Sequence, residues 1–105
     1  MFNYKTSKNL DRILLKLSKK DKKLYEQIIK KIHEVSNSSD IEHYKNLRYG
    51  LKEFKRVHIG KFVLVFRFDK KESLIYFTDF DNHDKIYLKR FWILNVRIFY
   101  LVLLR

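Results

Sequence analysis

The stretch FKRVHIGKFVLVFRF, Phe54 to Phe68, decides the fold of this chain. Basic and large apolar side chains are interleaved in it around a single glycine, Gly60. Two β-rich runs that flank one glycine are typical of a β-hairpin with a tight turn. A cation that is buried without a partner costs several kcal/mol. The basic residues of this hairpin therefore need either a solvated face or an anionic partner.

Strand alternation indicates how the hairpin divides its side chains. Arg56 and His58 lie two residues apart, so they point to the same face of the sheet. Lys55, Val57 and Ile59 point to the opposite face, where the two aliphatic side chains can be buried. The hairpin is therefore predicted to have one wet, basic face.

Upstream of the hairpin, the pattern changes to helical spacing. Residues 1–6 alternate weakly and predict an edge strand, and two amphipathic helices follow. Ser18, followed three residues later by Asp21, predicts the start of the second helix, and residues 37–40 predict its end. The short connection favours an antiparallel helical hairpin. The inward positions are Leu10, Ile13, Leu14 and Leu17 in the first helix and Leu24, Ile28, Ile32 and Val35 in the second.

Downstream of the hairpin, residues 69–71 predict a turn and residues 73–80 a third β-rich run, which the sequence DNHD (81–84) ends. The expected element order is β-α-α-β-β-β. The length of 105 residues and the 46% hydrophobic content are those of one domain, residues 1–105. Residues 91–105 are an apolar C-terminal extension, which is expected to pack on the helices, self-associate or meet a protein partner.

The charge balance indicates a polyanionic partner. Lysine and arginine number 24 against 12 acidic residues, which gives a formal net charge of +12. A small domain this basic usually meets nucleic acid or a ribosome, and less often an anionic membrane. We expect no membrane association, because the apolar run Trp92–Leu104 is shorter than the about 20 residues of a spanning helix. The absence of cysteine excludes disulfides and thiolate metal sites and fits the cytoplasm.

Two segments resemble the RelE/ParE superfamily of toxins from type II toxin–antitoxin operons, and most of all its RelE-like ribonucleases. Leu47–Phe66 is similar to the family's pattern of a leucine, a turn glycine, a basic strand, another turn glycine and an aromatic-led strand. Ile75–Tyr87 is similar to the family's last core strand, followed by a histidine and, four residues on, a tyrosine. The resemblance implies an α+β fold in which an N-terminal helical hairpin packs on a small twisted antiparallel sheet.

The resemblance also implies a function, that of an mRNA interferase. Such toxins enter the ribosome and cleave mRNA by attack of the ribose 2′-OH on the adjacent phosphorus, which inhibits translation. They need no metal and no cofactor, and a cognate antitoxin neutralises them in a hetero-oligomer. The chemistry requires proton transfer and cations that stabilise the transition state. The catalytic residues expected at the family's positions are Arg56, His58, His83 and Tyr87.

Each of these residues has an expected role. Arg56 can hold two phosphate oxygens at once with its planar guanidinium. His83 suits acid–base work, because an imidazole exchanges protons near neutral pH. Tyr87 would orient or stack on a base, or act as an acid near a cation. The cations expected to contact RNA are Lys52, Lys55, Lys61, Arg67 and Lys85.

One position departs from the family's pattern. Many family ribonucleases have an arginine directly after the aromatic residue that opens the second hairpin strand, but here Val63 follows Phe62. Lys61 or Arg67 would have to supply that cation. The departure leaves open two alternatives, a ParE-like toxin that inhibits DNA gyrase without being an enzyme and a basic RNA-binding module. A hard-metal site at Asp79, Asp81, His83 and Asp84 is disfavoured, because carboxylates are routine at strand ends.

Overall fold

The structure, a computed structural model, describes residues 2–47 and 53–88. Lys52 and the apolar extension at 91–105 lie outside the described residues. The chain forms β1 (Asn3–Thr6), α1 (Lys8–Lys20), α2 (Lys22–Ser36), the 3-10 helix η1 (Ile41–His43), β2 (Lys55–Ile59), β3 (Phe62–Asp69) and β4 (Leu74–Asn82). Residues 83–88 are helical and follow β4 directly.

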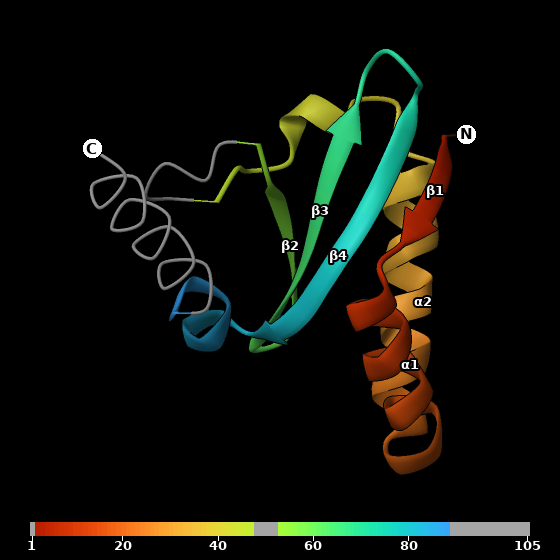
Figure 1. The fold of residues 1–105 in the computed structure, drawn as a ribbon, viewed down its shortest axis with the longest axis vertical. Coiled ribbons are helices and arrows are strands. Elements are labelled where there is room, and N and C mark those ends of the chain that lie inside the picture. The colour runs from red at the N-terminus through yellow and green to blue at the C-terminus, as the bar shows by residue number, and fades with distance from the viewer. Residues whose placement is uncertain (1, 48–52, 89–105) are drawn as a thin grey trace, which may run out of the picture.

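The four strands form one sheet in the order β1-β4-β3-β2. The expected α+β fold is confirmed, with the helical hairpin on one side of a small sheet (Figure 1). The sheet is mixed, however, and not wholly antiparallel as expected, because β1 pairs in parallel with β4. The reason is that α2 returns the chain to the end of the sheet where β1 began (Figure 1). Strand β2 then runs in the direction of β1, and two hairpins give β4 that direction too.

The two helices begin at side-chain caps. The Ser7 side chain accepts a hydrogen bond from Leu10 N at 3.0 Å, and Ser7 Oγ donates to Thr78 O at 2.7 Å. Asp21 caps α2 by accepting from Leu24 N at 3.2 Å. The predicted start at Ser18 was wrong, because Ser18 lies in the last turns of α1 and donates to Leu15 O instead. Asp21, and not Ser18, is the N-cap residue of α2.

The β2–β3 hairpin is confirmed as the sequence predicted. Ile59 and Phe62 are the last paired residues, so the turn consists of Gly60 and Lys61 alone. Gly60 has φ of 60°, a conformation that glycine adopts without steric cost. This short turn sets the register in which Arg56 lies opposite Val65 and His58 opposite Val63. The register places Arg56 and His58 on one face of the sheet and Lys55 on the other.

The core lies between the helices and one face of the sheet. Leu10 of α1 and Ile28 of α2 are fully buried there against β-strand residues such as Phe66 and Phe77. A second, smaller cluster contains Leu47, Val63, Val65 and Ile86. Because β3 alternates, Val63 and Val65 face away from α1 and α2. We call this side the basic face: Arg56 and His58 of β2, and Val63, Val65 and Arg67 of β3.

The end of β4 differs from the prediction. Asp81 and Asn82 were expected to break the strand, but β4 continues through both, because they pair with Val63 and Phe62 of β3. Helical structure begins at His83, and Asn82 Oδ1 caps it by accepting from Lys85 N at 2.9 Å. The helical turn at 83–88 lies on the opposite side of the sheet from α1 and α2 (Figure 1). It therefore packs on the basic face.

Candidate functional site

Four side chains meet on the basic face where β2 and the helical turn at 83–88 come together. β2 supplies Arg56 and His58, and the turn supplies His83 and Tyr87. The imidazole rings of His58 and His83 are stacked, with their centroids 6.0 Å apart. The ring centroids of His83 and Tyr87 are 4.8 Å apart. The structure thus brings together all four residues that the sequence singled out for catalysis.

Arg56 is held in place by this cluster. Its Nη1 donates a hydrogen bond to the Tyr87 hydroxyl oxygen at 2.8 Å. Its Nε is buried and has no hydrogen-bond partner among residues 2–47 and 53–88. Because Nε is shielded from solvent, the terminal nitrogens of the guanidinium are the ones that can donate to an incoming phosphate oxygen.

The surroundings of His58 disfavour the protonated form of its imidazole. Partial burial lowers the pKa of His58 below its usual 6.5, and the positive charges of Arg56, His83 and Lys45 lower this pKa further. His58 therefore stays neutral near pH 7 and can accept a proton. His83 has an acidic neighbour, because Asp84 Oδ1 lies 3.6 Å from its Nδ1 and forms an ion pair when the imidazole carries a proton.

Buried hydrophobic contacts position the helical turn. Ile86 is 1% exposed and packs against Leu47, Val63 and Val65. Val63, which stands where many family ribonucleases have an arginine, is thus part of the support for the turn that carries His83. The buried valine directly opposes His58 in the sheet. Where many family ribonucleases have a cation, this chain therefore has a hydrophobic contact.

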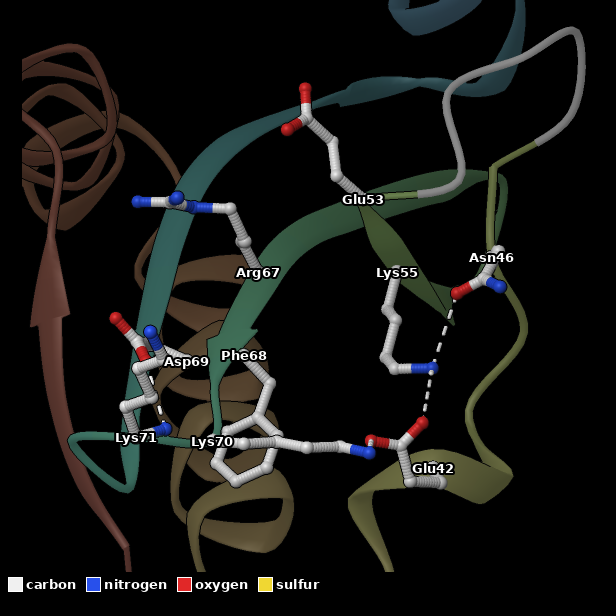
Figure 2. Close-up of a pocket in the computed structure, with 9 residues that line it drawn as sticks. All are labelled: Glu42, Asn46, Glu53, Lys55, Arg67, Phe68, Asp69, Lys70 and Lys71. Atoms are coloured by element: carbon white, nitrogen blue, oxygen red, sulfur yellow. Dashed lines mark hydrogen bonds and ion pairs between the residues drawn. The ribbon is translucent and has the colours of Figure 1, made fainter.

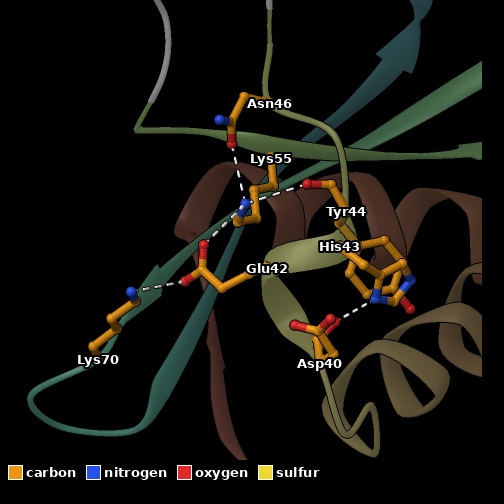
Figure 3. Close-up of polar contacts among 7 residues, drawn as sticks. All are labelled: Asp40, Glu42, His43, Tyr44, Asn46, Lys55 and Lys70. Atoms are coloured by element: carbon orange, nitrogen blue, oxygen red, sulfur yellow. Dashed lines mark hydrogen bonds and ion pairs between the residues drawn. The ribbon is translucent and has the colours of Figure 1, made fainter.

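The ammonium of Lys55 was expected to contact RNA, but it is bound by groups of the protein itself. It is 8% exposed, and its Nζ donates to Tyr44 O at 3.2 Å and to Asn46 Oδ1 at 3.1 Å. Glu42 lies 3.7 Å from the same Nζ and also pairs with Lys70 at 3.3 Å (Figure 3). This network ties β2 to the segment that follows η1.

An open depression of about 440 Å³ lies beside this network, lined by Lys55, Arg67 and Lys70 among others (Figure 2). Glu42, Glu53 and Asp69 also line it, so its charge is mixed. None of the four clustered residues lines it. The depression is therefore separate from the catalytic candidates.

The other expected RNA-binding cations are dispersed. Lys61 is exposed in the hairpin turn with its Nζ 5.6 Å from the centroid of the Phe62 ring. The guanidinium of Arg67 lies over the ring of Tyr76 at 4.9 Å. Lys85 is exposed on the helical turn at 83–88, and Lys52 lies outside the described residues.

The carboxylates of β4 do not form a metal site. In the part of the chain that the structure describes, no three histidine or acidic side chains are grouped so that they could hold a metal ion. Asp79 accepts a hydrogen bond from Asn9 Nδ2 at 3.1 Å, which links β4 to α1. No described helix is long and apolar enough to cross a membrane.

The sequence reasoning missed the contribution of residues 45–47. Leu47 packs under the helical turn at 83–88, and the charge of Lys45 acts on His58. Backbone hydrogen bonds hold this segment against β2. Lys45, Asn46 and Leu47 contain a single apolar residue and show no alternation, so their pattern does not predict a strand.

Comparison with known proteins shows close relatives of the sequence. No family model matches the chain. It is 50% identical over 91 residues to the protein named "Putative toxin RelE4" of Methanocaldococcus jannaschii, a match that covers 86% of this chain and 95% of that protein. It is 42% identical over 88 residues to a protein of Methanosarcina mazei named "Uncharacterized protein", covering 83% of this chain and all of that protein.

Solved structures share the fold. A chain of the toxin–antitoxin complex RelBE2 from Mycobacterium tuberculosis has a TM-score of 0.65 and 17% identity, covering 78% of this chain and 98% of that one. A metal-bound toxin from Helicobacter pylori has a TM-score of 0.64 and 26% identity, with coverages of 81% and 98%. The isolated E. coli RelE toxin has a TM-score of 0.59 and 18% identity, with coverages of 90% and 99%.

The helical hairpin on a small mixed sheet thus gives this chain the RelE fold. The 50% identity then shows the family directly: the chain belongs to the RelE family of toxins.

Proposed function

We propose that this protein is a ribosome-dependent mRNA endonuclease, the toxin of a type II toxin–antitoxin pair, acting in the cytoplasm. The single observation that carries the proposal is the convergence of Arg56, His58, His83 and Tyr87 on the basic face. These residue types supply what metal-independent RNA cleavage requires, namely proton donors, a proton acceptor and a cation.

In this mechanism His58, neutral because its pKa is lowered, accepts the proton of the ribose 2′-OH. The 2′-oxygen attacks the adjacent phosphorus, and the bond from phosphorus to the 5′-oxygen breaks. Arg56 stabilises the negative charge that develops on the phosphoryl oxygens. Protonated His83 gives its proton to the leaving 5′-oxygen. The products are a 2′,3′-cyclic phosphate and a 5′-hydroxyl.

The ribosome and its bound mRNA are the proposed partners in this reaction. The net charge of +12 favours binding to a polyanion of this kind. A cognate antitoxin is the third proposed partner, since a solved toxin–antitoxin complex contains a chain with this fold. Such a partner would neutralise the toxin in a hetero-oligomer.

The test is primer extension on a reporter mRNA in a translation extract, with the wild-type protein and with Arg56→Ala and His83→Ala. Cuts confined to codons on translating ribosomes, and lost in both variants, are the expected result. Lys16→Ala, an exposed lysine on α1, is the matched control and should cut like wild type. Intact mRNA with normal translation would overturn the proposal.

A second candidate, inhibition of DNA gyrase without catalysis, is favoured by one observation. Val63 is fully buried where family ribonucleases carry an arginine, so the site has one cation fewer at that position. A supercoiling assay distinguishes the two functions. This candidate requires that the protein inhibit gyrase and leave mRNA intact. A plain RNA-binding module would neither inhibit gyrase nor cleave mRNA, and it would bind RNA with a steep salt dependence.

A further inference from the structure

Residues 45–47 form a short extended segment that pairs with the outer edge of β2. Arg56 N donates to Lys45 O at 2.9 Å, and Leu47 N donates to Phe54 O at 2.9 Å. Between these two bonds, Asn46 and Lys55 form an antiparallel bridge. The three residues therefore have a fixed register against β2.

That register determines which way each side chain points. Residues directly opposite each other in an antiparallel pair place their side chains on the same face. Asn46 accordingly meets Lys55, and the two side chains are hydrogen-bonded at 3.1 Å (Figure 3). Lys45 and Leu47 must point to the other face, because successive side chains alternate. Leu47 does so, since it packs against Val63 and Val65 on the basic face.

Lys45 therefore lies on the basic face, beside Arg56. It is exposed, and it forms no ion pair with any residue in the described ranges 2–47 and 53–88. Its charge is close enough to act on His58, whose pKa it lowers together with Arg56 and His83. The electrostatic effect agrees with the placement that the register gives.

Lys55, unlike Lys45, is buried. Lys55 was expected to contact RNA, but the residue is only 8% exposed and its ammonium is held by Tyr44 O, Asn46 and Glu42. Val63 supplies no charge at the position where the family often has arginine. Of these three positions, only Lys45 places an exposed charge on the basic face, since Lys55 is held on the other face and Val63 is apolar.

We propose that Lys45 is a substrate-binding cation of this site, contacting the phosphate backbone of bound RNA beside Arg56. This inference rests on the proposed function for its substrate, RNA. It assigns to the segment before β2 a role that neither the hairpin nor the helical turn at 83–88 supplies.

The test uses two measurements that need no catalytic turnover, on the full chain with Lys45→Gln, Lys45→Arg and the control Lys16→Gln. The first is an NMR titration of His58, whose pKa should rise in Lys45→Gln and stay at the wild-type value in Lys16→Gln, because only the first change removes a nearby positive charge. The second is the affinity for a single-stranded RNA that 2′-O-methyl groups protect from cleavage. The slope of log affinity against log salt should fall by about 0.7 in Lys45→Gln, the change for one lost phosphate contact.

Lys45→Arg should keep both the His58 pKa and the salt slope close to wild type, because it keeps the charge. A His58 pKa and a salt slope in Lys45→Gln equal to those of Lys16→Gln would overturn the inference. If the wild-type protein cleaves no mRNA, the proposed function fails, but these two measurements still decide the role of Lys45. If cleavage occurs, kcat/KM should fall by about tenfold in Lys45→Gln, as for one charge-assisted contact.

Discussion

Arg56 of β2 and Tyr87 of the helical turn at 83–88 are joined by a hydrogen bond of 2.8 Å, from Nη1 to the phenolic oxygen. The bond fixes the guanidinium at the place where the two stacked imidazoles of His58 and His83 lie. It also spans two elements that are far apart in the sequence. The position of the catalytic candidates therefore depends on the docking of the turn as well as on the strand.

Replacing Tyr87 with phenylalanine should impair cleavage more than stability. The ring remains, so its contacts with the turn survive, but Arg56 loses its hydrogen-bond acceptor. We expect the cleavage rate to fall on the order of tenfold or more and the free energy of unfolding to fall by about 1 kcal/mol. Single-turnover cleavage and urea unfolding measure the two effects. Tyr25→Phe on α2 is the control; equal cleavage by the two variants would contradict the prediction.

The stability of the fold should depend on pH through His58. Its pKa is lowered in the folded protein, so the unfolded chain binds more protons as the pH falls through 6.5. The free energy of unfolding is therefore expected to decrease from pH 8 to pH 5. In His58→Gln this decrease should be smaller, because that titration is removed. Urea unfolding at intervals across this range tests the expectation, and parallel pH profiles for the two proteins would refute it.

Lys55 and Lys70 offer a matched comparison of a buried and an exposed partner of Glu42. The side chain of Lys70 is 74% exposed, whereas that of Lys55 is 10% exposed and makes two further hydrogen bonds. Lys55→Met should lower the free energy of unfolding by about 1–3 kcal/mol. Lys70→Met should lower it by no more than about 1 kcal/mol. Denaturant midpoints provide the measurement, and equal losses would show that Lys55 has no structural role.

Placing an arginine at Val63, as many family ribonucleases have at this position, should not improve cleavage. Val63 is fully buried against Leu47 and Ile86, so an arginine there must either bury its charge or displace the helical turn at 83–88. Val63→Arg should cost at least about 2 kcal/mol of stability and should reduce cleavage. Leu15→Arg, at a position that is 62% exposed, should change stability by about 0.5 kcal/mol or less. A Val63→Arg protein that is stable and cleaves faster than wild type would show that this reasoning is wrong.

The hairpin and the helices could be predicted because their signals are local. Gly60 between two β-rich runs indicates a tight turn. The spacing of Leu10 and Ile28 with their apolar neighbours is predicted from helical periodicity alone. The wrong start at Ser18 arose because serine and aspartate both cap helices, and only the observed bond to Leu24 N separates Asp21 from it. The parallel pairing of β1 depends on where α2 ends in space, which residue patterns do not encode.

The candidate site was likewise predictable in part from the sequence, and in part it depends on the tertiary structure. Strand alternation was enough to place Arg56 and His58 on one face, and the resemblance added His83 and Tyr87. Nothing in the sequence indicated that the ammonium of Lys55 would be held by Tyr44 and Asn46. That outcome follows from the pairing of residues 45–47 with β2, a contact that forms only in the tertiary structure.

The pairing of β1 with β4 has a consequence for the order in which the protein folds. Asn3 lies opposite Leu74 and Thr6 opposite Phe77, so β1 and its partner strand are separated along the chain by both helices and the other two strands. The local hairpins of β2, β3 and β4 can form without it, whereas this long-range pairing is slow to form. Tyr87 follows β4 closely. The sheet is therefore expected to close late in folding, and the helical turn that carries His83 and Tyr87 directly follows the strand that completes it.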